Sequence, residues 1–185
     1  MADEYPLRYR KAADQGNASG QVILGAMYSN GEGVPKDSAE AVKWYRKAAD
    51  QGQAFAQYFL GRMYDKGEGV AKDSAEAVKW YRKAADQGNV SAQYSLGVMY
   101  DDGEGVAKDS AEAVKWHRMA ADQGNAFAQY SLGFAYRFGE GVAKDSAEAV
   151  RWFRMAADQG YDLAQYFSAS RMPRAQVWQR TASKQ

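Results

Sequence analysis

The sequence predicts an all-α protein built as a solenoid of helix pairs, and three observations support this fold class. The chain has 185 residues, no cysteine, 46% hydrophobic residues and a formal net charge of +1, which is typical of a folded domain without disulfides. Of its 18 glycines, 17 recur with a 36-residue period. Residues 41–76 and 77–112 are identical at 30 of 36 positions. Such units cannot bury their apolar faces alone, so they are expected to stack and share a core.

The first element, residues 1–16, is predicted to be a capping helix. It corresponds to the second helix of the later repeats, but it begins at Tyr5 and carries Pro6 and Arg8 where later copies have valine and tryptophan. Terminal units of repeat arrays are commonly atypical because they cover the end of the shared core. The full repeats are expected at residues 17–52, 53–88, 89–124 and 125–160.

Each full repeat is predicted to begin with a helix, denoted helix A. In the third repeat this helix starts at Asn89, a typical N-cap, and ends at Gly103, with Leu96 on its apolar face. Gly97 lies in the middle of the helix, where glycine costs about 1 kcal/mol relative to alanine. Its recurrence in every full repeat predicts a close backbone approach by a neighbouring helix.

The segment GEGVAK connects helix A to a second helix, denoted helix B. Its two glycines suit positive backbone dihedral angles, and its valine can place an apolar side chain under the turn. Helix B, seen at residues 73–88, begins with Asp73 as N-cap, has Glu76 three residues later and ends at Gly88. Apolar residues recur between these points at helical spacing, so helix B is expected to have a broad apolar face.

The last element, residues 161–185, is predicted to be a degenerate repeat followed by a capping helix. Ser168 and Met172 replace the leucine and tyrosine of the earlier copies, and no GEGV loop follows. After Pro173 the chain is expected to form a helix in which Trp178 covers the end of the core. A disordered tail is the alternative.

One set of residues recurs with little change in the full repeats. In the second repeat these residues are Ala56, Leu60, Gly61, Tyr64, Gly67, Gly69, Val70, Asp73, Ala77, Trp80, Tyr81, Ala84, Ala85 and Gly88. The pattern covers roughly residues 5–167 and strongly resembles the Sel1-like repeat family, a relative of the tetratricopeptide repeats with a longer loop. The resemblance implies a right-handed α/α superhelix of antiparallel helix pairs. It also implies an adaptor or scaffold role, often in bacteria, and in some members an inhibitor or immunity role.

The positions that vary between repeats form one stripe along helix A. In the second repeat they are residues 55, 59, 62 and 66, whose spacing of four, three and four places them on one helix face. From the second repeat onward the candidate partner-binding residues on this stripe are Phe55, Phe59, Arg62, Lys66, Ser91, Ser95, Val98, Asp102, Phe127, Ser131, Phe134, Phe138, Leu163 and Phe167. The stripe is expected to be surface, whereas the nearly constant neighbouring stripe is expected to be core.

The leading hypothesis is a non-enzymatic module that binds a protein or peptide partner through this helix-A stripe. The resemblance places the stripe on a concave face, and several of its members are aromatic, as at interaction sites. The alternative for any single ring is that it packs between adjacent A helices. Two alternatives for the whole chain are an immunity protein that neutralises a toxic effector and a consensus-like engineered scaffold. Recent duplication accounts equally well for the similarity of the repeats.

The residues show no catalytic, cofactor-binding or metal-binding pattern. His117, the single histidine, occupies the slot of Tyr45, Tyr81 and Phe153, which indicates a packed aromatic substitute. The segment GEGVAKDS lacks the spacing of a phosphate-binding loop. The twelve residues 65–76 resemble a calcium loop in length but offer too few oxygen ligands. We therefore expect no enzyme activity, no cofactor and no metal.

The balanced charge argues against nucleic acid as a partner, because phosphate binding requires clustered basic residues. No apolar run approaches the length of about 20 residues that spans a bilayer, so no membrane insertion is expected. For the chain as given we expect a cytoplasmic location, or a periplasmic one if a signal peptide was removed. The expected oligomeric state is a monomer or a weak homodimer.

Overall fold

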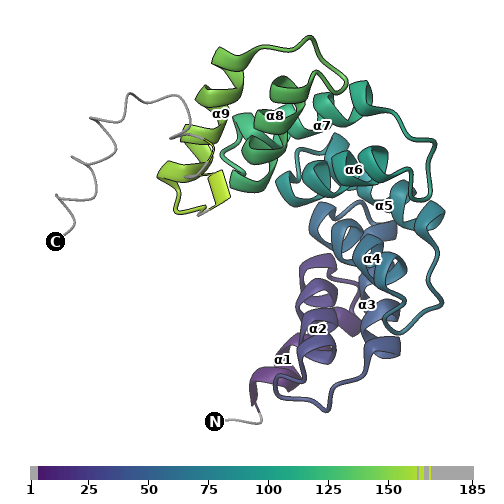
Figure 1. The fold of residues 1–185 in the computed structure, drawn as a ribbon. Coiled ribbons are helices and arrows are strands. Elements are labelled where there is room, and N and C mark those ends of the chain that lie inside the picture. Colours follow the sequence, from purple (N-terminus) through teal and green to yellow (C-terminus); the bar gives the residue numbers. More distant parts are fainter. Residues whose placement is uncertain (1–3, 162, 165–166, 168–185) are drawn as a thin grey trace, which may run out of the picture. The chain divides into compact units, whose positions relative to one another are not determined.

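A computed structural model describes residues 4–161, 163–164 and 167, and the regular secondary structure within this part of the chain is helical (Figure 1). The predicted all-α repeat fold is confirmed. The expected capping helix near the C-terminus and Trp178 lie outside the described residues. The helices are α1 Glu4–Asp14, α2 Ala18–Asn30, α3 Ser38–Asp50, α4 Ala54–Lys66, α5 Ser74–Asp86, α6 Val90–Asp102, α7 Ser110–Asp122, α8 Ala126–Phe138 and α9 Ser146–Asp158.

The helices belong to two compact units, which we describe separately. Unit 1 comprises residues 1–108 with α1 to α6, and unit 2 comprises residues 109–185 with α7 to α9. Helices α2, α4, α6 and α8 are A helices, and the odd-numbered helices are B helices. Within unit 1, α2 packs against α3 and α4 packs against α5, whereas within unit 2, α8 packs against α9.

The helix ends form as the sequence predicts. At the start of α5 the Asp73 carboxylate accepts a hydrogen bond of 2.9 Å from the backbone N–H of Glu76. At its end Gly88 adopts a φ of +85°. At the start of α6 the Asn89 side chain accepts a 2.9 Å bond from the N–H of Ala92, and Gly103 ends that helix with a φ of +73°. These bonds satisfy backbone groups that a helix leaves without partners inside itself.

The constant stripe of helix A lies in the core, as expected. In unit 1, Ala56 and Leu60 are fully buried, and they pack in one cluster with Tyr45 and Trp80 from two B helices. The glycine at the middle of helix A faces both a ring and a helix backbone. A Cβ built on Gly61 would lie 2.8 Å from Cδ1 of Tyr81 and 3.3 Å from the backbone carbonyl oxygen of Ala77 in α5, so the predicted backbone approach is present and the ring makes the tighter contact.

A closer backbone approach involves the second glycine of the loop. A Cβ on Gly69 would collide with the backbone carbonyl of Ser38, at the start of α3 in the preceding repeat. Gly69 also has a φ of +70°. The loop glycine is therefore required both by its backbone conformation and by contact with the neighbouring repeat.

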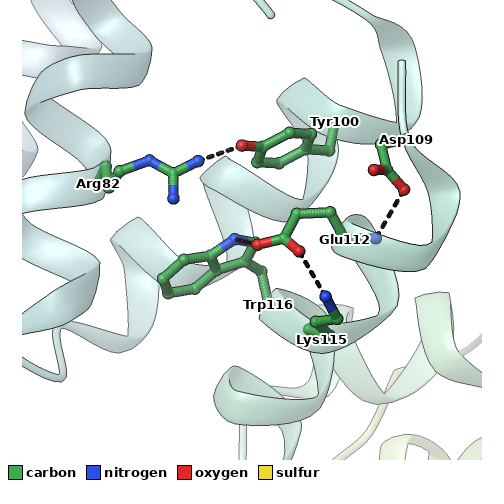
Figure 2. Close-up of polar contacts among 6 residues, drawn as sticks. All are labelled: Arg82, Tyr100, Asp109, Glu112, Lys115 and Trp116. Atoms are coloured by element: carbon green, nitrogen blue, oxygen red, sulfur yellow. Dashed lines mark hydrogen bonds and ion pairs between the residues drawn. The ribbon is translucent and has the colours of Figure 1, made fainter. Parts of the chain in front are cut away.

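Polar contacts recur between neighbouring repeats inside each unit. In unit 1 the Arg82 guanidinium donates to the Tyr100 hydroxyl (Figure 2), and Arg46 does the same to Tyr64. Buried glutamines form a second series. The Gln57 side chain donates to the Ala49 carbonyl at 3.2 Å and accepts from Gln87 at 2.7 Å.

In unit 2, Glu112 joins three contacts at the start of α7 (Figure 2). Its backbone N–H donates to Asp109 at 3.0 Å, and its carboxylate accepts from Lys115 at 2.8 Å and from Trp116 at 3.1 Å. The N-cap bond and the Lys–Glu ion pair recur in α3 and α5, so these contacts fix the helices but place the same groups in each of these repeats. Selective function therefore has to come from the positions that vary.

Candidate binding surface

The variable stripe of helix A lies at the molecular surface. None of its fourteen candidate side chains is buried, whereas Leu60 and Leu96 of the constant stripe are fully buried. The exposed apolar members include Phe55, Phe127 and Phe138, with exposed fractions of 63%, 50% and 56%. Exposed aromatic side chains leave apolar area in contact with water, and such side chains are typical of interaction surfaces.

The exposed polar members lie on α4 and α6. The surface-exposed polar and charged residues of the stripe are Arg62, Lys66, Ser91 and Asp102, and Leu163 is a further exposed apolar member at 59%. The half-buried members are Phe59, Ser95, Val98, Ser131, Phe134 and Phe167. The outer positions of the stripe are thus exposed, and its middle positions, apart from Arg62, are partly covered.

In unit 1 the partly covered ring of Phe59 stacks on Tyr45 of α3, with ring centroids 5.2 Å apart and an interplanar angle of 18°. Burial raises the pKa of the Tyr45 hydroxyl to about 12, and the nearby Arg62 guanidinium partly offsets this effect. The ring of Phe59 therefore belongs to the packing between helices. The alternative interpretation placed such rings between adjacent A helices, whereas this contact is with a B helix.

An open hollow of about 300 Å³ lies between α4 and α6 in unit 1. Arg62 and Lys66 line it from α4, and Asp102 lines it from α6. Lys66 forms a 2.8 Å ion pair with Asp65, and this contact raises the pKa of the Lys66 amine. Both signs of charge thus meet at this hollow, which suits it for orienting a partner at the rim of an interface.

In unit 2 the variable stripe belongs to a continuous aromatic cluster. Phe134 lies at its centre, with its ring centroid 4.8 Å from Tyr130, 5.5 Å from Phe153, 5.1 Å from Phe167 and 5.6 Å from Phe138. The ring of Phe138 thus packs on Phe134 and is still 56% exposed. The cluster presents a rigid aromatic edge to solvent.

Tyr130 and Tyr161 belong to this cluster but are not on the predicted stripe. The ring of Tyr161 lies 4.9 Å from Tyr130 and 5.1 Å from Phe127. Tyr161 occupies the slot that holds asparagine at residues 89 and 125, and this departure from the repeat is a signal that could have identified it. Tyr130 has tyrosine equivalents at residues 58 and 94, so its constancy concealed its place at the surface.

His117 lies on α7 in the predicted aromatic slot and is 2% exposed.

Among the residues that the structure describes, no group of three or more His, Cys, Asp or Glu side chains could hold a metal ion. The same part of the chain has no helix with the length and apolar character needed to cross a membrane.

Comparison with known proteins gives matches over nearly all of the described chain. The family model for the Sel1 repeat matches residues 9–17, 18–53, 54–89, 90–125 and 126–161. No curated protein matches the sequence.

Solved structures with the same fold include a protective antigen of uropathogenic Escherichia coli strains that displays an SLR fold. It is 41% identical with a TM-score of 0.87, and the match covers 89% of this chain and 35% of the antigen. A Sel1 repeat protein from Oxalobacter formigenes is 43% identical with a TM-score of 0.80, over 84% of this chain and 62% of that protein. An immunity protein from Pseudomonas aeruginosa is 27% identical with a TM-score of 0.57, and the match covers 93% of this chain and 65% of that protein. This chain spans less than two thirds of each of them.

Proposed function

Since this chain belongs to the Sel1 repeat family, we propose that it is a non-enzymatic module that binds a protein partner through the variable stripe of its A helices. The observation that carries this proposal is the exposure of Phe55, Phe127 and Phe138 on a scaffold whose other helix-A positions hardly vary. Their burial against an apolar partner surface removes aromatic area from water, which is a main source of binding energy at interfaces.

The charged members of the stripe support orientation rather than affinity. Arg62 and Asp102 are exposed, and both line the hollow between α4 and α6. Charges at the rim of an interface mainly change the association rate and the choice of partner. Substitution of these residues should therefore affect selectivity more than the strength of binding to the true partner.

The test is quantitative capture of the natural partner from cells that produce the chain. We compare the wild type with Phe55→Ser and with the double variant Phe127→Ser/Phe138→Ser. These rings are at least half exposed, so their loss should leave the fold intact. Phe134→Ser is unsuitable alone, because this ring packs on Phe153.

The matched control is Met119→Ser, which removes an exposed apolar side chain from a B helix in unit 2. We expect capture to fall at least tenfold in the phenylalanine variants and to stay unchanged in the control. Equal capture by all folded variants would remove the stripe as the binding surface.

A second candidate function is inhibition of a toxic effector. Two similar structures are immunity proteins from Pseudomonas aeruginosa, each 27% identical, with TM-scores of 0.57 and 0.54. If this chain has such a role, its co-expression with the toxin encoded beside it rescues growth, and the Phe127→Ser/Phe138→Ser variant does not. Absence of rescue by the folded wild-type chain argues against this role and leaves the adaptor role in place.

A further inference from the structure

Unit 2 contains a hollow of about 390 Å³ where α8 ends and α9 begins. Phe153, Val150 and Phe167 give it apolar walls. Arg137 and Lys144 are the charged residues among those that line it, and no acidic residue is among them. The hollow is therefore apolar inside and positively charged at its edge.

The positive charge distinguishes this repeat from the others. Arg137 occupies the slot that holds Asp65 and Asp101 in the two preceding repeats. Phe138 occupies the slot of Lys66 and Asp102. An arginine thus replaces an aspartate at the first position, and a phenylalanine replaces a charged residue at the second. Because the two preceding repeats have aspartate at the equivalent position, the repeat fold does not require an arginine there.

Lys144 also differs in its surroundings from its equivalents. In unit 1 the equivalent Lys72 forms an ion pair of 3.4 Å with Glu104, which lies 32 residues later in the next loop. The residue 32 positions after Lys144 is Gln176, so the sequence supplies no carboxylate there. Among the described residues Lys144 has no ion pair.

Aromatic rings hold the Arg137 guanidinium at the edge of the hollow. Its Cζ atom lies 5.0 Å from the ring centroid of Phe167 and 5.7 Å from that of Phe138. Stacking restricts the side chain but uses none of its five N–H donors. Within the described part of the chain, Arg137 makes no ion pair, so its charge has no acidic partner there and can pair with a carboxylate of a ligand.

We propose that this hollow binds an acidic segment of the partner protein in which a carboxylate side chain adjoins a large apolar side chain. The apolar side chain fills the space beside Phe153, and the carboxylate accepts hydrogen bonds from Arg137 and Lys144. This inference rests on the proposed function, since it names the chemistry of the partner. The chain's own residues 168–185 are a poor occupant, because they contain four basic side chains and no acidic one.

The test measures binding of two capped peptides to the full ¹⁵N-labelled chain by NMR titration, which detects millimolar affinities. The first peptide is acetyl-Gly-Ser-Phe-Glu-Ser-Gly-amide, and the second has Gln in place of Glu. We expect the Glu peptide to bind about tenfold more tightly, with shifts at Phe138 and Ser146, because charge-assisted bonds are the stronger ones.

Arg137→Asp should abolish the preference for the Glu peptide while keeping the fold, since aspartate is the residue at this slot in other repeats. The matched control is Arg154→Gln, which removes an exposed arginine of α9 that does not line the hollow. Equal binding of both peptides to the wild type, or a preference retained by Arg137→Asp, overturns the proposal.

Occupation by the chain's own C-terminal residues also has a distinct outcome. In that case the Glu peptide binds only after Trp178→Ser, and the proposal is wrong. Loss of partner capture in the Phe127→Ser/Phe138→Ser variant tests the proposed function separately. Capture that depends on those rings, together with no Glu preference, retains the binding surface and rejects only the acidic ligand.

Discussion

The ring of Tyr81 packs against the α-carbon of Gly61, which lies twenty residues earlier on the preceding A helix. The B helix and the A helix fit so closely here that no space is left for a methyl group on Gly61. Tyr45 has the same relationship to Gly25, and Phe153 has it to Gly133. This contact lets α4 and α5 approach closely and buries Tyr81 almost completely. It explains why a residue that weakens helices recurs at the centre of helix A.

Gly61→Ala is therefore expected to destabilise the protein. Helix propensity alone predicts a gain of about 1 kcal/mol. The added methyl group would lie 2.8 Å from Cδ1 of Tyr81, and overpacking of this kind costs about 1–3 kcal/mol, so the clash outweighs the gain. Urea unfolding followed by circular dichroism measures the sign. A Tyr81→Ala background should remove the penalty, and an equal penalty in both backgrounds would contradict the contact.

Gly69→Ala should destabilise the protein more than Gly67→Ala. The two glycines have nearly equal φ angles, +70° and +71°, so the cost of a left-handed alanine, about 1–2 kcal/mol, is shared. A methyl group on Gly69 also collides with the Ser38 carbonyl, whereas on Gly67 it meets the Lys72 side chain at 3.3 Å. The difference between the two melting temperatures isolates the contact between repeats. Equal melting temperatures would show that the loop can move away.

Gln87→Leu is expected to cost about 1–3 kcal/mol in unfolding free energy, because it leaves the buried side-chain oxygen of Gln57 without its donor. The matched variant is Gln57→Leu, which removes that oxygen together with the bond to the Ala49 carbonyl. This carbonyl still accepts from the backbone N–H of Gly52 at 2.9 Å, so the change should cost only about 0.5–1.5 kcal/mol. Urea unfolding of both variants gives the comparison. A larger effect at Gln57 than at Gln87 would contradict this assignment.

Alkaline pH should destabilise the wild type through its buried tyrosines. Burial raises the pKa of Tyr45 to about 12, against an ordinary value near 10 in the unfolded chain. The folded state therefore holds this proton more tightly, and the stabilisation is present below pH 10 and is lost as the pH rises toward 12. Tyr45→Phe should reduce this loss by up to about 3 kcal/mol. Parallel stability curves for the two proteins between pH 9 and pH 12 would refute the assignment.

Repetition made much of this structure predictable. The N-caps Asp73 and Asn89 and the left-handed glycines follow from local rules, and the structure has them where the sequence indicates. The comparison of repeats also separated the buried Leu60 from the exposed Phe55. Each conclusion depends on residues close together in the sequence or on a period of 36 residues, which require no knowledge of packing.

The contacts of individual side chains were less predictable. The recurrence of Gly61 indicated a close backbone approach, which the Ala77 carbonyl of α5 makes at 3.3 Å, but it did not indicate the still closer ring of Tyr81. The sequence placed Phe55 and Phe59 on the same stripe, yet Phe59 is covered by Tyr45 while Phe55 is free. Tyr161 joined the aromatic cluster without belonging to the stripe at all.

The sequence by itself thus determined the repeat, the helix ends, the core stripe and the variable stripe. Only the tertiary structure decided which variable side chains are accessible and which neighbours they share. Helical spacing shows the face on which a side chain lies, but coverage depends on side chains from other helices and loops. Arg137, Lys144 and Phe167 line one hollow although they come from different segments of the chain, and no spacing rule joins them.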